Sequence, residues 1–152
     1  MNIYYISLIS SMCLVSCSPS DKFRTVRGTS MLPSYADGKI VEINTKFRND
    51  DLKIGDVVVI ISPIDGKSEW IRRIVGIGPM RISANNNVLK IGDKSMSLNQ
   101  IGIKGEPSFS EPISELNLSH GFVYVIGDNL RNAVDSREFG PLPTKNIVGV
   151  VK

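Results

Sequence analysis

The chain has 152 residues, of which 41% are hydrophobic and 22% charged, a balance typical of one globular domain. The formal net charge of +3 is too small to indicate a nucleic-acid partner. Both cysteines, Cys13 and Cys17, precede residue 20, so the rest of the chain holds neither a disulfide framework nor a Cys-based zinc site. With His120 as the only histidine, a Ser–His catalytic pair requires that residue as its base, and no metal or other cofactor is indicated.

Residues 1–20 contain no charged side chain, whereas the rest of the chain holds 18 Lys and Arg and 15 Asp and Glu residues. This break predicts a targeting segment over 1–20 and a folded domain over 21–152. The apolar stretch Ile3–Cys17 has 15 residues, fewer than the roughly 20 of a membrane-spanning helix. It ends in Leu-Val-Ser-Cys, which resembles the lipobox of bacterial lipoproteins and implies a lipid on Cys17. An uncleaved membrane anchor and an incidental apolar start are the alternatives. A lipid anchor or an uncleaved membrane anchor would each hold the domain at a membrane, on its extracytoplasmic side.

Short β-branched segments separated by turn residues follow, and they predict a mainly β, antiparallel β-sheet domain. The predicted strands are Lys39–Ile43, Asp56–Ile61, Glu69–Ile77, Met80–Ser83, Val88–Ile91, Phe122–Ile126 and Ile147–Val151. Asn85-Asn86-Asn87 predicts a hairpin turn. Residues 92–118 are polar and contain Gly, Pro and Ser, which predicts a short irregular insertion. No amphipathic helix longer than two turns is expected.

Three groups of motifs follow one another along the chain. They are Gly28-Thr29-Ser30-Met31-Leu32-Pro33; Gly55-Asp56-Val57-Val58 with Trp70-Ile71-Arg72-Arg73; and Gly127-Asp128-Asn129 with Asp135-Ser136-Arg137 and Gly140-Pro141-Leu142-Pro143. In this order they resemble the type I signal peptidases, the S26 serine proteases, from about Arg27 to Val151. The resemblance implies a mostly antiparallel β domain outside the cytoplasm. It also implies an extended peptide or preprotein substrate with a small-x-small cleavage site, and a Ser/Lys dyad.

Ser30 matches the nucleophile of that family. A serine hydroxyl needs a neighbouring base, and the family uses a buried Lys kept neutral by desolvation. Arg72 stands at the position of this Lys, and a guanidinium with a pKa above about 12 cannot accept a proton. Ala133 stands where the family often has a Ser that orients the Lys. Three other residues could in principle serve as a base, and none is a good candidate: Lys39, Lys67 and His120.

The resemblance also implies roles for residues around the dyad. Met31 and Leu32 would line a small pocket for the residue before the cleavage site. Trp70 and Ile71 would flank a groove in which the peptide adds as a strand. Ordinary core packing is the alternative for these four residues.

The charged residues within these motifs have a structural interpretation. Half-buried charges must be paired, and Gly-Asp-Asn is turn chemistry. The resemblance suggests that Arg73 pairs with Asp128 and that Asp135 pairs with Arg137. These pairs would hold two strand ends together.

Two functions remain in competition. The first is a membrane-tethered serine endopeptidase acting on exported proteins, with Ser30 as nucleophile; conjugative pilin-processing proteases are a variant of it. The second is a catalytically inactive S26 domain that binds peptides or serves in assembly, with Arg72 in the base pocket and able to bind a carboxylate. Self-cleaving Ser/Lys repressors are disfavoured, because they carry a DNA-binding module for which this chain has no room.

Overall fold

The chain folds into two antiparallel β-sheets in a computed structural model that describes residues 22–104, 109 and 111–152. The expected targeting segment 1–20, with Cys17, lies outside the described residues. Within them no helix is long and apolar enough to cross a bilayer; α1 (Ser136–Phe139), for example, has four residues.

The larger sheet has seven strands in the spatial order β1–β2–β11–β3–β4–β9–β10. All of its neighbouring strands are antiparallel. Their bounds are β1 (Phe23–Thr25), β2 (Ile40–Asn44), β3 (Val57–Ile61), β4 (Glu69–Ile77), β9 (Phe122–Ile126), β10 (Leu142–Pro143) and β11 (Ile147–Val151).

The burial of two strands follows directly from their sequences. All five residues of β3 are β-branched and apolar, and the strand lies in the middle of the sheet between β11 and β4. β2 lies nearer the sheet edge and alternates instead, with Val41 and Ile43 buried and Ile40 and Asn44 exposed. The position of a strand in the sheet therefore matches its hydrophobic pattern.

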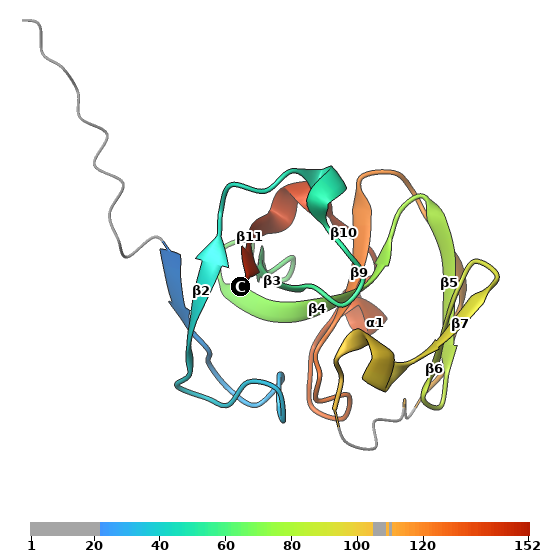
Figure 1. Ribbon diagram of the computed structural model, residues 1–152, viewed down its shortest axis with the longest axis horizontal. Helices are drawn as coiled ribbons and strands as arrows, with labels where there is room; N and C mark the ends of the chain where they lie inside the picture. Colours follow the sequence, from blue (N-terminus) through green and yellow to red (C-terminus); the bar gives the residue numbers. More distant parts are fainter. Residues whose placement is uncertain (1–21, 105–108, 110) are drawn as a thin grey trace, which may run out of the picture.

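The smaller sheet has four strands in the order β7–β6–β5–β8. Their bounds are β5 (Met80–Asn85), β6 (Val88–Ile91), β7 (Lys94–Ser97) and β8 (Ile113–Leu118). The chain leaves the larger sheet at the end of β4, builds the smaller sheet, and returns as β9, which pairs with β4. Figure 1 shows the strands of the smaller sheet at one end of the molecule and β1 and β2 at the other.

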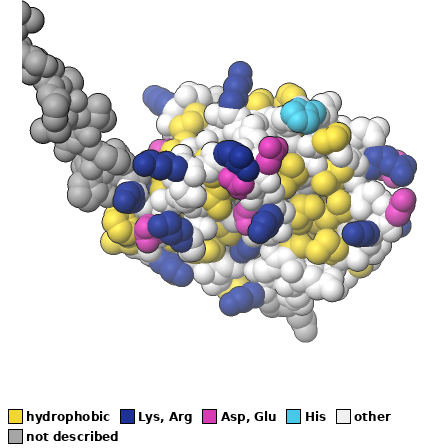
Figure 2. Space-filling view, turned by 45° about the horizontal axis from the view of Figure 1, so that its top comes forward, with side chains coloured by type: hydrophobic (Ala, Val, Ile, Leu, Met, Phe, Trp, Pro, Cys, Tyr) yellow, Lys and Arg dark blue, Asp and Glu magenta, His cyan; other side chains and the backbone are white. Residues whose placement is uncertain are grey.

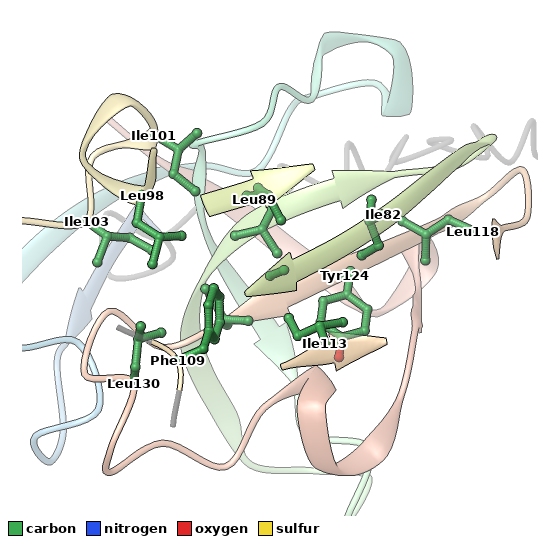
Figure 3. Packing of buried hydrophobic residues seen from close by; sticks show 13 residues of the cluster. Ile82, Leu89, Leu98, Ile101, Ile103, Phe109, Ile113, Leu118, Tyr124 and Leu130 are labelled. Atoms are coloured by element: carbon green, nitrogen blue, oxygen red, sulfur yellow. The ribbon is translucent and has the colours of Figure 1, made fainter. Parts of the chain in front are cut away.

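The prediction of an irregular insertion over residues 92–118 is wrong in its secondary structure. This range contains β7, the short helix η3 (Leu98–Ile101) and β8. Its apolar side chains, among them Leu98, Ile103 and Leu118, are buried in one cluster with side chains of β5 and β6 (Figure 3). Most of its described residues face solvent and are polar, and only a few apolar side chains pack into the cluster. This is why the composition of the segment did not indicate strands.

The seven predicted strands are all present, with ends shifted by two residues at most. The hairpin turn between β5 and β6 is confirmed, with Asn86 at a φ of 54°. The unpredicted strands are β1, β7, β8 and β10; β1 and β10 have three and two residues, too few to show a period. Two further one-turn helices are η2 (Asn49–Asp51) and η4 (Thr144–Asn146). The mainly β, antiparallel fold class is confirmed.

Charged side chains are spread over the surface. On the face in Figure 2, Lys and Arg side chains are interspersed with Asp, Glu and apolar side chains instead of forming one stripe. Surface pairs such as Arg81 with Asp93 and Glu115, each at 3.7 Å, join exposed side chains. Such pairs contribute about 0–1 kcal/mol, so surface ion pairs are not what holds the fold together.

Candidate active site

A groove of about 790 Å³ opens between β1 and the first residues of β4. Residues 23–31 line it along β1 and the turn that follows, and residues 68–72 line it along β4. Val59, Asn132 and Val134 complete the lining. The groove therefore brings together the motif around Ser30 and the motif around Arg72, which lie far apart in the sequence.

Ser30 lies in the turn that follows β1, and its neighbours fix its backbone. Gly28 has a φ of +78°, a conformation that glycine adopts without strain. The backbone N–H of Asn129 donates to the Ser30 carbonyl at 2.9 Å, and the Asn129 side-chain amide donates to the Thr29 carbonyl at 3.1 Å. Gly127 packs against the Ser30 carbonyl so closely that a Cβ there would lie 2.6 Å from the oxygen. The Gly-Asp-Asn turn thus positions Ser30.

Arg72 contacts Ser30 directly. Its Nη1 donates to Ser30 Oγ at 3.0 Å and to the Ile71 carbonyl at 2.6 Å. Nε and Nη2 both donate to the Val134 carbonyl, at 3.0 and 2.7 Å. The guanidinium also lies 5.1 Å from the centroid of the Trp70 ring. Because arginine has no acceptor atom, Ser30 Oγ accepts a hydrogen bond here and has no base in Arg72 to take its proton.

Arg72 is a buried cation, with 6% of its surface exposed. Among the described residues no carboxylate lies within 4.0 Å of it. Burial lowers the pKa of Arg72, and the negative charge of Asp135 opposes this effect. A guanidinium starts from so high a pKa that it stays protonated. Carbonyl oxygens, a hydroxyl and an aromatic ring therefore surround a permanent positive charge.

Arg73 has a different environment from its neighbour. Its Nε and Nη2 donate to the two carboxylate oxygens of Asp128 at 2.8 and 2.6 Å, and Nη1 donates to the Gly55 carbonyl at 2.7 Å. The side chains of the pair are 9% and 0% exposed. This contact, which the resemblance suggested, joins β4 to the Gly-Asp-Asn turn.

Asp135 and Arg137, the second pair that the resemblance suggested, also form an ion pair. Arg137 Nε and Nη2 donate to the Asp135 carboxylate at 2.8 and 2.7 Å, and Nη1 donates to the Leu130 carbonyl at 2.6 Å. The fully buried Asp135 also accepts the Gly127 N–H at 2.9 Å. Burial alone would lower the pKa of Arg137, but the hydrogen bond and charge of Asp135 raise it. This pair fixes the start of α1 against the turn that holds Ser30.

The residues expected along the groove are mostly found there. Met31, which is 1% exposed, lines it together with Trp70 and Ile71. Leu32 is half-buried and does not line it. The lining along this part of the chain ends at Met31, in the turn that contains Ser30.

The three other candidate bases do not line the groove. Lys39 Nζ lies 4.7 Å from the centroid of the Tyr35 ring, and Lys67 and His120 are exposed in turns. Within the described part of the chain, Ser30 Oγ makes a hydrogen bond with Arg72 alone. Across the same residues, no group of three or more His, Cys, Asp or Glu side chains is placed to hold a metal ion.

Some groups at the site had no clear signal in the sequence. Val134 acts through its backbone carbonyl, which any residue type supplies. Asn132 donates from its side chain to Thr29 Oγ1 at 2.8 Å, and its polar character alone did not set it apart from other turn residues. Ala133, at the position of the family's orienting Ser, lies against Gly127. A carbonyl next to Ala133 therefore orients the Arg72 side chain where the family often uses a hydroxyl.

An ion pair joins the two walls of the groove and was also missed. Arg24 of β1 donates to the Glu69 carboxylate of β4, from Nε at 2.5 Å and from Nη2 at 3.2 Å. The two side chains are 25% and 34% exposed. Two charged residues 45 positions apart have no local pattern that would reveal the pairing.

Known proteins resemble this chain over most of its length. The family model described as "Signal peptidase, peptidase S26" matches residues 2–152. Signal peptidase I of Bacillus caldolyticus is 26% identical over 136 residues, which cover 83% of this chain and 74% of that protein. Mitochondrial inner membrane protease subunit 1 of Saccharomyces cerevisiae is 30% identical, over 86% of this chain and 65% of the relative. Mitochondrial ATP-independent inner membrane protease subunit 1a of Arabidopsis thaliana is 32% identical, over 82% and 64%. The chain thus spans slightly less than two thirds of the two mitochondrial relatives.

A solved structure has the same fold. The crystal structure of a signal peptidase I from Enterococcus faecalis superposes with a TM-score of 0.57 at 20% sequence identity. The match covers 67% of this chain and 97% of that one. At this identity the likeness concerns the arrangement of the sheets.

Proposed function

This chain belongs to the signal peptidase family, peptidase S26, and from that premise we propose that it binds an exported polypeptide beside Ser30 without hydrolysing it. The family implies peptide or preprotein ligands. The observation that carries the proposal is the hydrogen bond from Arg72 Nη1 to Ser30 Oγ at 3.0 Å. A residue that only donates holds the place from which a base would take the serine proton.

Two strand edges support binding of an extended peptide. Among the residues that the structure describes, β1 pairs with β2 alone, and the part of β4 before Arg73 pairs with β3 but not with β9, whose register begins at Arg73. Each of these segments lines the groove and has one edge to which no described strand is bonded. A peptide strand added there would satisfy the free backbone groups. Met31 and Ile71 give this part of the groove an apolar lining, which supports a ligand with small apolar side chains.

We place the domain at a membrane, on its extracytoplasmic side, tethered by residues 1–20. The support is the uncharged segment with Cys17 at its end, together with relatives named as inner membrane proteases. Mass spectrometry of the chain isolated from membranes tests the form of the tether. An added lipid mass on Cys17 supports the lipid anchor, whereas an unmodified chain that begins at Met1 contradicts it.

A second candidate is a serine endopeptidase with Ser30 as nucleophile. It is favoured by the position of Ser30 in the groove and by the ion pairs that still hold its turn in place. This enzyme would need a proton acceptor other than Arg72.

A restoration experiment separates the two functions. The whole 152-residue chain is purified in detergent and incubated with a preprotein that carries an Ala-x-Ala site. Cleavage is followed for wild type, Ser30→Ala, Arg72→Lys, and Arg72→Lys combined with Ala133→Ser. Binding of the same preprotein is measured in parallel by fluorescence anisotropy.

We expect the wild type to bind without cleaving, and the double variant to gain cleavage because it regains a base and its orienting hydroxyl. Cleavage by wild type that is lost in Ser30→Ala would establish the endopeptidase and reject our proposal. A wild type that binds no peptide would reject it as well.

A further inference from the structure

Hydrogen-bond donors are concentrated at Ser30. The only bond of its Oγ within the described residues is accepted from Arg72, so the hydroxyl proton is available to a ligand. The Ser30 backbone N–H makes no hydrogen bond to any described protein group. Arg72 Nη2 has two N–H groups, and one of them is bonded, to the Val134 carbonyl. The Ser30 hydroxyl, the Ser30 backbone N–H and Arg72 Nη2 therefore each have an O–H or N–H that the described residues leave free for a ligand.

The charges of the groove favour an anion. Its lining contains three arginines, Arg24, Arg27 and Arg72, and one carboxylate, Glu69, which Arg24 binds. Arg72 remains without a carboxylate partner among the described residues, although it is buried. A buried charge of this kind is strongly attracted to an opposite charge.

The acidic groups behind Arg72 do not neutralise it by contact. Asp135 and Glu138 act on it at a distance, and the charge of Arg137 opposes them. The Asp135 carboxylate is already bound by Arg137 and by the Gly127 N–H. Glu138 is exposed to solvent, which screens its charge.

We propose that Arg72 and Ser30 form a carboxylate-binding site, and that the groove holds a peptide ending in a free C-terminal carboxylate at Ser30 in preference to one that continues past it. The inference rests on the proposed function, since it names the ligand of the same groove. In a protease, the carbonyl of the bond to be cut lies beside the serine. A C-terminal carboxylate places two charged oxygens at that point, within reach of the Ser30 N–H, the Ser30 hydroxyl and the guanidinium.

The size of the preference follows from the type of bond. A hydrogen bond from Arg72 is charge-assisted for a neutral carbonyl as well as for a carboxylate. Only the carboxylate adds the attraction between two opposite charges, which is strong at a buried site. We therefore expect roughly ten- to a hundredfold tighter binding of the acid than of the amide.

The test measures dissociation constants by fluorescence anisotropy with the whole chain in detergent. The probes are labelled peptides ending in Ala-Ser-Ala with a free carboxylate, the same peptide as its C-terminal amide, and the same sequence continued beyond the alanine. A fourth probe, an amide with Glu in the last position, carries its carboxylate on a side chain. The variants are Arg72→Gln and, as a matched control, Arg81→Gln on the smaller sheet, where Arg81 is exposed.

We expect the free acid to bind at least about tenfold more tightly than the other three probes. The preference should disappear in Arg72→Gln and persist in Arg81→Gln. The comparison of acid with amide in the wild type needs no variant, so it stands even if Arg72→Gln folds poorly. Equal affinity for acid and amide would overturn this inference and leave peptide binding intact. Tighter binding of the Glu probe would overturn the choice of the C-terminus, and failure of all probes to bind would overturn the proposed function too.

Discussion

Arg72 and Arg73 are consecutive residues of β4, and their side chains have different partners on the two sides of the strand. On the scaffold side, Arg73 forms a two-pronged ion pair with the buried Asp128. On the groove side, Arg72 meets the Ser30 hydroxyl and the Val134 carbonyl. Since neighbouring strand residues point to opposite faces, one residue type serves two purposes.

In this fold, the paired arginine supports the structure, and the arginine bonded to neutral groups is available for binding. A paired buried charge has its desolvation compensated and contributes to a defined geometry. A buried cation bonded only to neutral groups keeps its attraction for an anion. The scaffold side should therefore be sensitive in stability, and the groove side in ligand binding.

The largest effect on stability is expected from Asp128→Ala, which leaves Arg73 buried and unpaired. The loss should be about 3–5 kcal/mol in the free energy of unfolding, measured by urea denaturation. Replacing both partners, Arg73→Met with Asp128→Leu, should recover most of it, because no charge is then left alone. A loss below about 1 kcal/mol for the single variant would mean that the pair does not support the scaffold.

Gly127→Ala should have the next largest effect, because the new Cβ would lie 2.6 Å from the Ser30 carbonyl oxygen. Overpacking of this kind costs about 1–3 kcal/mol. The shift of Ser30 should also weaken peptide binding, which anisotropy would detect. Gly66→Ala, in the turn between β3 and β4, is a control for backbone strain without overpacking, because φ is +68° there but the added Cβ would meet nothing within 4 Å. Unchanged peptide affinity in Gly127→Ala would contradict the link between the turn and the site.

A third prediction concerns Tyr124, which is buried in the apolar cluster under the smaller sheet, and the effect of its pKa on stability. Burial, with help from the charge of Asp135, raises its pKa to about 12, while an unfolded tyrosine titrates near about 10. Below about pH 10 both states hold the proton and stability is unaffected; as the pH rises from there to about 12, the unfolded state releases it first. Stability should fall by about 2 kcal/mol over that window. Tyr124→Phe should lack this part of the alkaline loss in urea denaturation curves, and identical curves for both proteins would refute the assignment.

The smallest effect is expected from Arg72→Met. It removes a buried charge that pairs with no carboxylate in the described part of the chain, and water can solvate the exposed Val134. The free energy of unfolding should therefore change by less than about 1 kcal/mol. The same denaturation experiment measures it. A loss as large as that of Asp128→Ala would place Arg72 among the structural residues and remove the contrast between the two sides of β4.

Much of the larger sheet was readable from the sequence, because β3, β4, β9 and β11 are β-branched runs whose pattern requires burial. The segment 92–118 was misread, because its apolar residues are sparse and become a core only when the smaller sheet assembles. At the site, the family resemblance suggested both ion pairs, whereas Leu32, expected in the groove beside Met31, lies outside its lining.

The sequence alone determined which chemical groups are present: Ser30, Arg72 and Ala133, at the positions where the resemblance predicts a nucleophile, its base and an orienting hydroxyl. It also determined that the strands are antiparallel and few residues are helical. The tertiary structure decided that Arg72 reaches Ser30 Oγ and the Val134 carbonyl, contacts that join residues 42 and 62 positions apart. Local preferences act over a few neighbouring residues, whereas such contacts depend on how the sheets pack, so the unpaired charge in the groove became visible only in the folded chain.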